Sequence, residues 1–397
     1  MSADAPPGGP GWLAALRRRY ASDLHETRSA AWLGIALGVA FGVCFATGVW
    51  SHLAQHPPGW FTYPARPAGL YRITQGAHVI TGTAAIPLLL AKLWVVHPHL
   101  LAWPPARSLL HAVERLALLP LVGGALFLLL SGTANVAGWY PWTFFFPRAH
   151  FWAAWITIGA LVVHVGAKAA TTREALRRGG SRVAAPGSAP EPAATAAARP
   201  ADRRAFLGGV AAASGALVVA TAGGTVSPLG GLSVLAQRRP GVGPQGVPVN
   251  KTAVAARVLG PARDPGYRLA IEGAVPRPVA LSLADLRALP QREATLPIAC
   301  VEGWSASARW RGVPVRDLLA LAGAGPRAEV TVESLQPSGL YRSSTLNPAQ
   351  TADADTLLAL ALGGEPLHID HGYPARLVGP NRPGVSQTKW VHRLVVR

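Results

Sequence analysis

A single cysteine, Cys300, has surroundings that suit metal chemistry. It follows the apolar run Leu-Pro-Ile-Ala at residues 296–299, which predicts a strand, and it precedes the turn-like sequence Val-Glu-Gly-Trp-Ser. A cysteine at a strand end beside Glu, Trp and Ser suits a thiolate ligand for a soft metal. A buried structural cysteine is the alternative when the residue is considered alone. The second cysteine, Cys44, lies inside an apolar segment, so we expect no disulfide between the two.

Two ordered sequence blocks surround and follow this cysteine. The first reads Cys-Val-Glu-Gly-Trp-Ser at 300–305 and continues as Trp-Arg-Gly-Val-Pro-Val-Arg-Asp-Leu-Leu at 310–319. The second spans 364–380, contains Asp-His-Gly-Tyr-Pro-Ala-Arg, and is followed by Lys389-Trp390-Val. Together they resemble the sulfite oxidase family of molybdopterin-dependent oxidoreductases over residues 245–397. The resemblance implies that family's α+β fold, a molybdenum–molybdopterin cofactor, and direct ligation of molybdenum by the cysteine thiolate.

The cofactor phosphate needs cationic partners, and arginine is the preferred bidentate one. By their positions in the second block, Arg376, Arg382 and Lys389 are the candidates that the resemblance provides. Solvated surface positions are the alternative for each charge taken alone. Ser386 stands where relatives often carry a basic residue, so this anion pocket is expected to be arranged differently.

Three uncharged residues complete the implied site. His371, in Asp-His-Gly, suits either a hydrogen bond to the cofactor or the support of a turn. Asn250 resembles an asparagine near the metal in the exported methionine-sulfoxide-reductase-like relatives, and Tyr341 resembles a pocket tyrosine. The chain ends soon after Trp390, without the dimerisation domain that follows in sulfite oxidases proper, which favours these smaller bacterial members and counts against sulfite as the substrate.

Composition indicates a membrane protein with a soluble part. Half of the 397 residues are hydrophobic, 14% are charged and the mean hydropathy is +0.26. The net charge of +18 arises largely from Lys and Arg beside apolar segments, and no nucleic-acid motif accompanies it, so we expect no nucleic-acid partner. Two cysteines are too few for a cysteine-ligated iron–sulfur cluster, and no Cys-x-x-Cys-His motif for c-type haem occurs.

Four apolar runs, each long enough to span a bilayer, occupy the first part of the chain. They predict an all-α transmembrane bundle over residues 1–170, with spans near 30–50, 75–96, 116–137 and 151–170. Lys and Arg gather at one set of ends, and the opposite loops are rich in Trp, Tyr, Phe and Pro. The positive-inside rule therefore places both ends of the bundle in the cytoplasm and the aromatic cluster 139–146 at the outer interface.

Residues 171–202 are rich in Ala, Pro, Gly and Ser and predict a flexible cytoplasmic linker. The next segment, 203–226, opens with Arg203-Arg204-Ala-Phe-Leu before a weakly apolar run. It resembles an internal twin-arginine export signal, and a fifth helix with anchoring arginines is the alternative. Either interpretation sends the C-terminal domain out of the cytoplasm, across the inner membrane. Ala220-Thr-Ala222 suits a cleavage site, but we favour retention of the segment as a membrane anchor.

Residues 245–397 mix two periodicities. Alternating segments near 267–272, 329–334 and 391–396 predict strands, and helical periods near 282–289, 313–322 and 353–362 predict helices. Strands and helices without a regular βαβ alternation favour an α+β domain. This agrees with the fold that the resemblance implies, so the expected chain is an α-helical membrane bundle followed by an α+β molybdopterin domain.

Histidines inside membrane spans are functional candidates because ionisable groups are costly there. His150 and His164 are fourteen residues apart on the fourth span, which returns them to nearly the same helix face. His78, near the outer end of the second span, can pair with His150 to ligate a b-type haem. His164 is a candidate ligand for a second haem, although Lys92 occupies the position where the partner of His164 would be expected. Interfacial histidines without ligand function are the alternative, and the bundle resembles four-helix cytochromes b only loosely.

The combined hypothesis is a membrane-bound molybdoenzyme that performs oxygen-atom transfer outside the cytoplasm. Its substrate would be a small oxo-acid or a sulfoxide, and haem b would carry electrons to or from a quinone pool or another redox protein. Two alternatives are a molybdoenzyme on a haem-free anchor and a non-catalytic extracytoplasmic binding module on the same fold.

Overall fold

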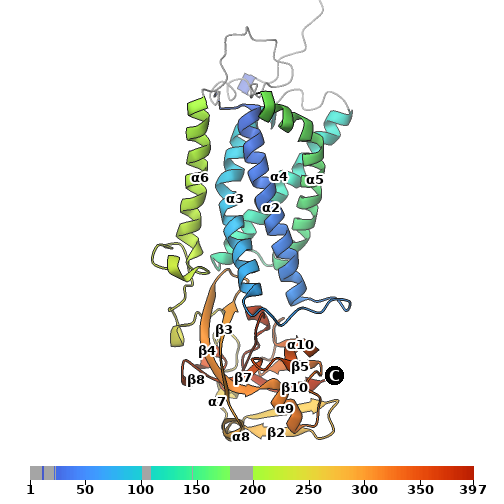
Figure 1. Ribbon diagram of the computed structural model, residues 1–397, viewed down its shortest axis with the longest axis vertical. Helices are drawn as coiled ribbons and strands as arrows, with labels where there is room; N and C mark the ends of the chain where they lie inside the picture. Colours follow the sequence, from blue (N-terminus) through green and yellow to red (C-terminus); the bar gives the residue numbers. More distant parts are fainter. Residues whose placement is uncertain (1–10, 13–21, 23, 101–108, 145, 179–199) are drawn as a thin grey trace, which may run out of the picture. The chain divides into compact units, whose positions relative to one another are not determined.

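The structure is a computed structural model that describes residues 11–12, 22, 24–100, 109–144, 146–178 and 200–397 (Figure 1). It divides into two compact units. The helical unit comprises Met1–Ala46 and Ile80–Val219, and the sheet unit comprises Thr47–Val79 and Ala220–Arg397. The boundary cuts helices α2 and α3, so the ends of these two helices and the connection between them belong to the sheet unit.

Among the described residues, five helices are long and apolar enough to cross a membrane, with a mean hydropathy of 1.5 to 2.0 over their most apolar windows. The four predicted spans are confirmed as apolar helices, and the segment that begins with the arginine pair forms a fifth. Helices are favoured in such segments because they satisfy every backbone polar group internally. Their bounds are α2 Thr27–Gln55, α3 Leu70–Leu100, α4 Leu109–Val136, α5 Phe146–Arg178 and α6 Pro200–Ala222.

Helix α5 continues to Arg178, past the end expected near residue 170. The extension contains Arg, Glu, Ala and Leu, which are strong helix formers and outweigh its two threonines. The linker predicted for 171–202 is therefore shorter at both ends, because α6 already begins at Pro200. Its central residues 179–199 lie outside the described residues, as do Arg17–Arg19, Arg107 and Arg182 of the positive-inside argument.

Two five-stranded sheets form most of the sheet unit. The first has the order β2-β1-β10-β5-β6, in which β1 and β10 are parallel and the other pairs antiparallel. The second has the order β3-β4-β7-β8, with β9 also paired to β7, and is antiparallel throughout. The strands are β1 Arg268–Gly273, β2 Val279–Ser282, β3 Arg292–Ala299, β4 Ser305–Pro314, β5 Val330–Ser334, β6 Ser343–Leu346, β7 Leu357–Leu362, β8 Glu365–Pro366, β9 Arg376–Val378 and β10 Val391–Val396.

Short helices connect these strands. Helix α8 begins with a capping box, because the Ser282 hydroxyl accepts from the Asp285 amide while the Asp285 carboxylate accepts from the Ser282 amide. The predicted strands near 267–272, 329–334 and 391–396 and the helices near 282–289 and 313–322 all occur, which confirms the α+β class. The short helices are α7 Leu259–Arg263, α8 Leu283–Ala288, α9 Val315–Leu321 and α10 Pro348–Ala352, with 3-10 turns at Ser227–Leu229, Pro244–Gly246, Ile369–His371 and Gly384–Ser386.

The helix predicted over 353–362 is wrong. Residues Leu357–Leu362 form strand β7, which lies between β4 and the two strands β8 and β9. Every residue of this Leu-Leu-Ala-Leu-Ala-Leu strand is buried. A strand buried on both faces has no polar alternation, so its sequence cannot be told from a buried helix by periodicity.

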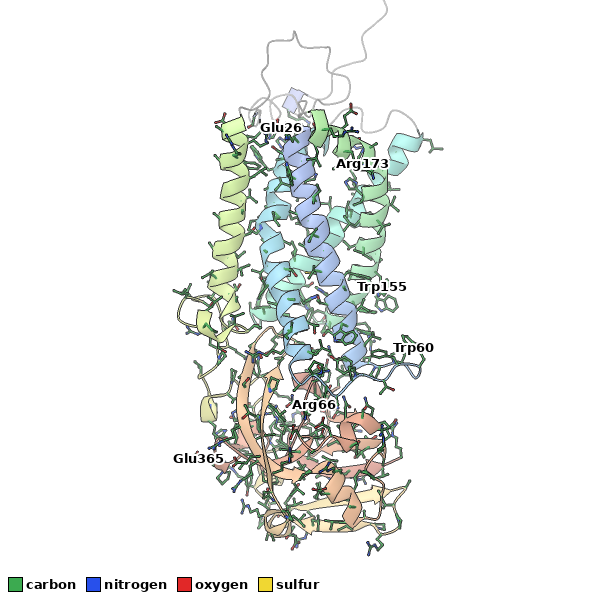
Figure 2. The ribbon with its side chains drawn as sticks, in the orientation of Figure 1. Glu26, Trp60, Arg66, Trp155, Arg173 and Glu365 are labelled. Atoms are coloured by element: carbon green, nitrogen blue, oxygen red, sulfur yellow. The ribbon has the colours of Figure 1, made fainter. Side chains whose placement is uncertain are left out.

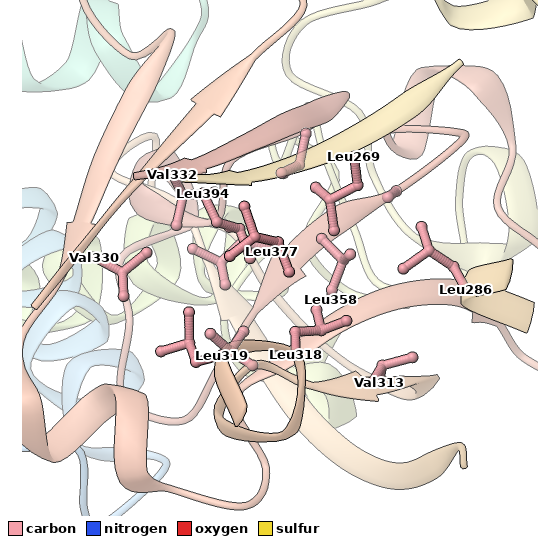
Figure 3. Close-up of a cluster of buried hydrophobic side chains, with 14 of the residues drawn as sticks. Leu269, Leu286, Val313, Leu318, Leu319, Val330, Val332, Leu358, Leu377 and Leu394 are labelled. Carbon is pink, nitrogen blue, oxygen red and sulfur yellow. The ribbon is translucent and has the colours of Figure 1, made fainter. Parts of the chain in front are cut away.

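The main hydrophobic core joins both sheets to α9 (Figure 3). Leu269 and Leu394 come from the first sheet, Leu358 and Leu377 from the second, and Leu318 from α9; all five are fully buried. A second core cluster involves β3, β4, β7 and β9 and includes Cys300, Trp304 and Trp310. The candidate metal ligand therefore lies at the edge of a packed core, where its backbone is held firmly.

Candidate functional site

One pocket of the sheet unit brings together four of the predicted site residues: Cys300, Asn250, Arg376 and Lys389. Cys300 follows β3, Arg376 opens β9, and Lys389 lies two residues before β10 begins at Val391, so three different strands position these side chains. The lining residues are Pro248, Asn250, Ile298, Cys300, Trp304, Arg376, Gly384 and Lys389.

The thiol is carried on a tight turn between β3 and β4. The Cys300 amide donates to the Trp304 carbonyl at 2.8 Å, and the Gly303 amide donates to the Cys300 carbonyl at 3.1 Å. Gly303 has a φ of +85°, which a residue without a Cβ adopts at little cost. The Cys-Val-Glu-Gly-Trp sequence therefore encodes the turn that presents the sulfur.

A half-buried ion pair supports this turn from outside the family block. The Glu302 carboxylate accepts from the Arg238 guanidinium at 2.7 Å and from the Trp304 indole at 3.0 Å. The Ser305 amide donates to the Gly224 carbonyl at 2.8 Å, and the Thr225 hydroxyl donates to the carbonyl of the turn glycine. Sequence reasoning missed Arg238, because a partner 64 positions away leaves no local signal.

Cys300 is 1% exposed. Burial raises the pKa of its thiol well above the ordinary value, and the charge of Glu302 raises it further. A thiol in this environment is a poor nucleophile on its own, since the thiolate is the reactive form. A metal ion deprotonates a coordinating thiol outright, so ligation is the chemistry that this environment favours.

Two cations face this sulfur. Burial lowers the pKa of Arg376 to about 10, and the negative charge of Cys300 opposes the shift. Burial lowers the pKa of Lys389 well below its usual value, and the charge of Arg376 lowers it further. The Lys389 ammonium donates to the carbonyls of Lys251 and Asp370 at 2.9 and 2.8 Å, and the Arg376 guanidinium lies 5.3 Å from the Trp310 ring centre.

Arg382 is buried outside this pocket lining. Its guanidinium donates to the Gln350 side chain at 2.7 Å and to the Ser386 and Thr345 carbonyls at 2.8 and 3.2 Å. Burial lowers its pKa to about 10. These bonds connect the loop after β9 to β6 and α10, a structural role that motif position alone does not reveal. The Arg382 Nε has no hydrogen-bond partner among the described residues.

His371 is buried and neutral. Burial lowers its pKa to about 4, although a hydrogen bond to the Pro244 carbonyl at 2.7 Å opposes that shift. Because the carbonyl can only accept, Nε2 carries the proton and Nδ1 is left as an acceptor. Nδ1 has no partner among the described residues, so the ring retains capacity for one donor.

Asn250 and Tyr341 are the more accessible members of the predicted set. Asn250 lines the pocket, and its side-chain oxygen accepts from the Lys251 amide at 2.9 Å. Burial raises the pKa of Tyr341, and the charge of Cys300 adds to the rise, which puts the two side chains within electrostatic range. Tyr341 does not belong to the pocket lining itself.

The buried cations of this region leave a positive charge that an anionic cofactor would neutralise. Arg376, Arg382 and Lys389 have no carboxylate partner within the described part of the chain. A buried cation without an anion is costly. An anionic cofactor beside Cys300 would supply the missing charge to Arg376 and Lys389, and the buried Nε of Arg376 lacks a protein partner. The residues therefore fit a molybdopterin with its phosphate.

Two of the predicted haem ligands occupy matching niches. The His78 Nδ1 lies 3.2 Å from the Thr47 hydroxyl, and the His150 Nδ1 lies 2.8 Å from the Ser131 hydroxyl. In each case the next residue of the neighbouring helix is a glycine, Gly48 or Gly132, whose missing Cβ would lie 3.2 or 3.7 Å from the imidazole. A hydroxyl within hydrogen-bond distance of one ring nitrogen restricts the orientation of each imidazole.

The third predicted ligand, His164, lies half-buried on α5. Lys92, at the position where its partner was sought, donates to the Ala30 carbonyl at 2.6 Å. The hydroxyl–glycine pair is shared by the environments of His78 and His150, and the sequence contains it as Thr47-Gly48 and Ser131-Gly132.

Residues 258–397 match the family model described as "Oxidoreductase molybdopterin binding domain". The chain is 34% identical to the mitochondrial sulfite oxidase of Rattus norvegicus over 164 residues, covering 34% of this chain and 30% of that enzyme. It is 33% identical over 130 residues to a protein of Azospira oryzae named "Putative protein-methionine-sulfoxide reductase subunit YedZ1", covering 33% of this chain and 48% of that protein. The chain thus spans less than half the length of these curated relatives.

Among solved structures, the sulfane dehydrogenase SoxCD from Paracoccus pantotrophus matches with 30% identity and a TM-score of 0.31, covering 33% of this chain and 38% of that one. The family match and the relatives agree with the resemblance carried by the two sequence blocks. The C-terminal part of the chain is an oxidoreductase molybdopterin-binding domain, and apolar helices long enough to cross a membrane precede it.

Proposed function

Starting from a C-terminal oxidoreductase molybdopterin-binding domain, we propose that this chain is a membrane-bound molybdopterin-dependent enzyme in which Cys300 ligates the metal. The observation that carries the proposal is the pocket where Cys300 meets Arg376 and Lys389, two cations without a carboxylate partner among the described residues. When bound, molybdopterin supplies a redox-active metal that exchanges an oxygen atom and two electrons.

The protein residues hold and orient this group. The Cys300 turn fixes the sulfur through two backbone hydrogen bonds, and the Glu302–Arg238 pair locks the turn. Arg376 and Lys389 neutralise the anionic ligand, and its binding relieves the repulsion between them. Asn250 lines the same pocket and offers an amide to a polar substrate or to the cofactor.

For the substrate we propose a small oxo-acid or a sulfoxide. One relative is named a sulfite oxidase and another a putative protein-methionine-sulfoxide reductase subunit, and these two names supply the candidate substrate classes. Oxidation would take an oxygen atom from water and release two electrons and two protons, and reduction would run in the opposite sense. Tyr341, within electrostatic range of Cys300, is the proposed side chain for contact with the substrate.

The cysteine assignment can be tested with the chain's own second cysteine as the control. We would purify the wild type, Cys300→Ser and Cys44→Ser from membranes after molybdate-replete growth, and quantify molybdenum per protein. The proposal expects molybdenum in the wild type and in Cys44→Ser, with little in Cys300→Ser. Equal molybdenum in all three variants would refute the ligand assignment, and its absence from the wild type would favour a non-catalytic binding module.

We also propose that the apolar helices carry b-type haem, with His78 and His150 as iron ligands and His164 as the candidate for a second haem. The matching niches of His78 and His150 support this assignment, because a fixed Nδ1 leaves the ring oriented for ligation through Nε2. Haem would connect the molybdenum site with a quinone pool or another redox protein. A haem-free anchor is the competing proposal.

A reduced-minus-oxidised absorption spectrum distinguishes the two. Haem b gives sharp visible bands, which His150→Ala should remove or halve and the control His97→Ala should leave unchanged. Ser131→Ala should keep the bands but shift the reduction potential, because it removes only the hydroxyl beside the ligand. A wild type without these bands would support the bare anchor.

For localisation we propose the inner membrane, with the sheet unit outside the cytoplasm and α6 retained as an anchor. Arg203 supports retention, since its guanidinium pairs with the buried Glu26 carboxylate at 3.2 Å. Ala222 and Gly223 are also buried, so the proposed cleavage bond is shielded in the folded protein. A twin-arginine export role for Arg203 and Arg204 is tested by replacing both with lysine and measuring the exported fraction.

A further inference from the structure

The connection after α6, here called the post-α6 loop (residues 223–239), exposes three neighbouring apolar side chains. Leu232, Val234 and Leu235 are 63%, 80% and 58% exposed. Isolated exposed apolar residues are common, but a cluster of large ones on a short loop marks a surface that another apolar phase covers. The loop follows α6 directly at the edge of the sheet unit (Figure 1).

Hydrogen bonds fold this loop back onto the end of α6. The Leu235 amide donates to the Ala220 carbonyl at 2.8 Å, and the Gly223 amide donates to the hydroxyl of the buried Ser233 at 2.6 Å. Gly223 permits the approach, because a Cβ there would lie 2.5 Å from that hydroxyl and 2.8 Å from the Gly230 Cα. The loop is therefore a fixed structure beside the last helical turn.

This arrangement sets the depth of the apolar side chains. The apolar span of α6 covers Ala201–Ala222, with a mean hydropathy of 1.8. Ala220 lies in its last turn, about 3 Å along the axis from the end of the span. Because the Leu235 backbone bonds to Ala220, it lies at the same level, which corresponds to the boundary between hydrocarbon and headgroups if α6 crosses a bilayer.

The charge pattern of the loop selects the partner. Residues 223–237 contain no charged side chain. The two arginines that follow are engaged by the protein, since Arg238 pairs with Glu302 at 2.7 Å and Arg239 donates to the Gly230 carbonyl at 3.1 Å. The surface offered by Leu232, Val234 and Leu235 is apolar, as a lipid boundary requires.

We propose that residues 232–235 insert into the lipid surface beside α6 and form a second membrane attachment of the sheet unit. The inference rests on the proposed membrane location of α6. The same loop holds the metal-binding turn, through Thr225 to the Gly303 carbonyl and through Arg238 to Glu302. Insertion therefore fixes the Cys300 turn to the membrane surface through a short and rigid connection.

The test measures depth at three positions in lipid nanodiscs. In a Cys44→Ser, Cys300→Ser background, single variants Val234→Cys, Val219→Cys and Leu321→Cys carry a nitroxide label. Val219 is an exposed residue of the α6 span, and Leu321 is an exposed leucine on α9. The readout is the ratio of collisions with oxygen to collisions with a water-soluble nickel complex, which rises inside lipid.

We expect the label at 234 to give a ratio several-fold above that at 321 and close to that at 219. A lipid-like value at 219 with a water-like value at 234 would overturn the loop insertion while leaving the membrane assignment intact. Water-like values at both positions would overturn both. Strong spin–spin broadening at 234 would identify a second copy of the chain as the cover and would also overturn the proposal.

A second measurement keeps both native cysteines in place. The photoreactive amino acid benzoylphenylalanine replaces Val234, and membranes are irradiated before purification. A lipid adduct on the intact protein, detected by mass, is the expected result, with the same substitution at Leu321 as the control. Adducts to protein alone at 234 would overturn the proposal.

Discussion

Replacing Asn381 should loosen the sheet unit by a predictable amount. The residue is 1% exposed, and its side chain joins the loop after β9 to the connection between α2 and α3. Its Oδ1 accepts from the Tyr71 amide and its Nδ2 donates to the Pro64 carbonyl, both at 2.7 Å. Its own amide donates to the Ala68 carbonyl at 3.0 Å and survives a side-chain substitution.

Asn381→Ala removes both of these bonds and a longer one, in which the Tyr63 hydroxyl donates to Oδ1 at 3.4 Å, and it leaves the Tyr71 amide and the Pro64 carbonyl without their partner. Each orphaned group costs about 1–3 kcal/mol, so the free energy of unfolding should fall by roughly 2–6 kcal/mol. Asn381 also has a φ of +51°, where a Cβ costs about 1–2 kcal/mol that asparagine tolerates better than alanine. Asn381→Gly loses the same bonds without that strain and is therefore the matched control.

The assay is thermal unfolding of the purified chain in nanodiscs, followed by a probe of the sheet unit. For a unit of about 200 residues, 1 kcal/mol moves the midpoint by roughly 2–4 °C, so a loss of about 3 kcal/mol lowers it by roughly 6–12 °C. Asn381→Ala should melt below Asn381→Gly, and both should melt below the wild type. A midpoint unchanged in Asn381→Ala would show that the connection is not bound as described.

Three further substitutions test other parts of the unit. Gly303→Ala places a Cβ at a φ of +85°, costs about 1–2 kcal/mol, and should lower both the melting midpoint and the molybdenum content. Arg376→Met removes a buried cation that lacks an acid partner among the described residues. It should therefore raise the melting midpoint of cofactor-free protein and reduce molybdenum retention. A lower midpoint would contradict the argument that this unpaired buried charge is destabilising. Partial burial alone would raise the pKa of Asp355, but hydrogen bonds from Arg66 and Arg292 outweigh it and leave that pKa below the usual value. A depressed carboxylate pKa adds stability that is present above about pH 4 and is lost as the pH falls through the folded-state pKa, so Asp355→Asn should flatten the acid side of a stability–pH curve.

The sequence predicted the elements whose signal is local. Alternation indicated β1, β5 and β10, and the cysteine block and the second block indicated a pocket that does contain Cys300, Arg376 and Lys389. Motif position favoured Lys389 over Arg376 and Arg382 as a cofactor ligand, but it could not show where the Arg382 side chain lies. Only the fold shows that the Arg382 guanidinium is taken up by Gln350 and neighbouring carbonyls.

Other features depend on contacts that no local pattern records. The connection between α2 and α3 looks like a simple membrane loop, yet Arg66 bonds to Asp353 and Asp355, nearly 290 positions away (Figure 2). Trp60, at 81% exposure on the same connection, remains outside this contact (Figure 2). Cross-chain pairs of this kind become visible only when the fold brings both partners together.

The turn that carries Cys300 shows what such contacts imply for the proposed metal site. The family match begins at residue 258, but the turn at 300–304 is held by segments that precede it. The Gln75 side chain of α3 donates to the Val301 carbonyl at 3.4 Å, and the Thr225 hydroxyl donates to the Gly303 carbonyl. The Arg238 guanidinium donates to the carboxylate of Glu302, the residue between Val301 and Gly303. A scaffold that fixes a ligand from several directions is what a metal site needs, because small displacements of the ligand weaken binding and orientation. The unit that positions Cys300 therefore includes the ends of apolar helices, and this gives a physical reason for joining a molybdopterin domain and those helices in one chain.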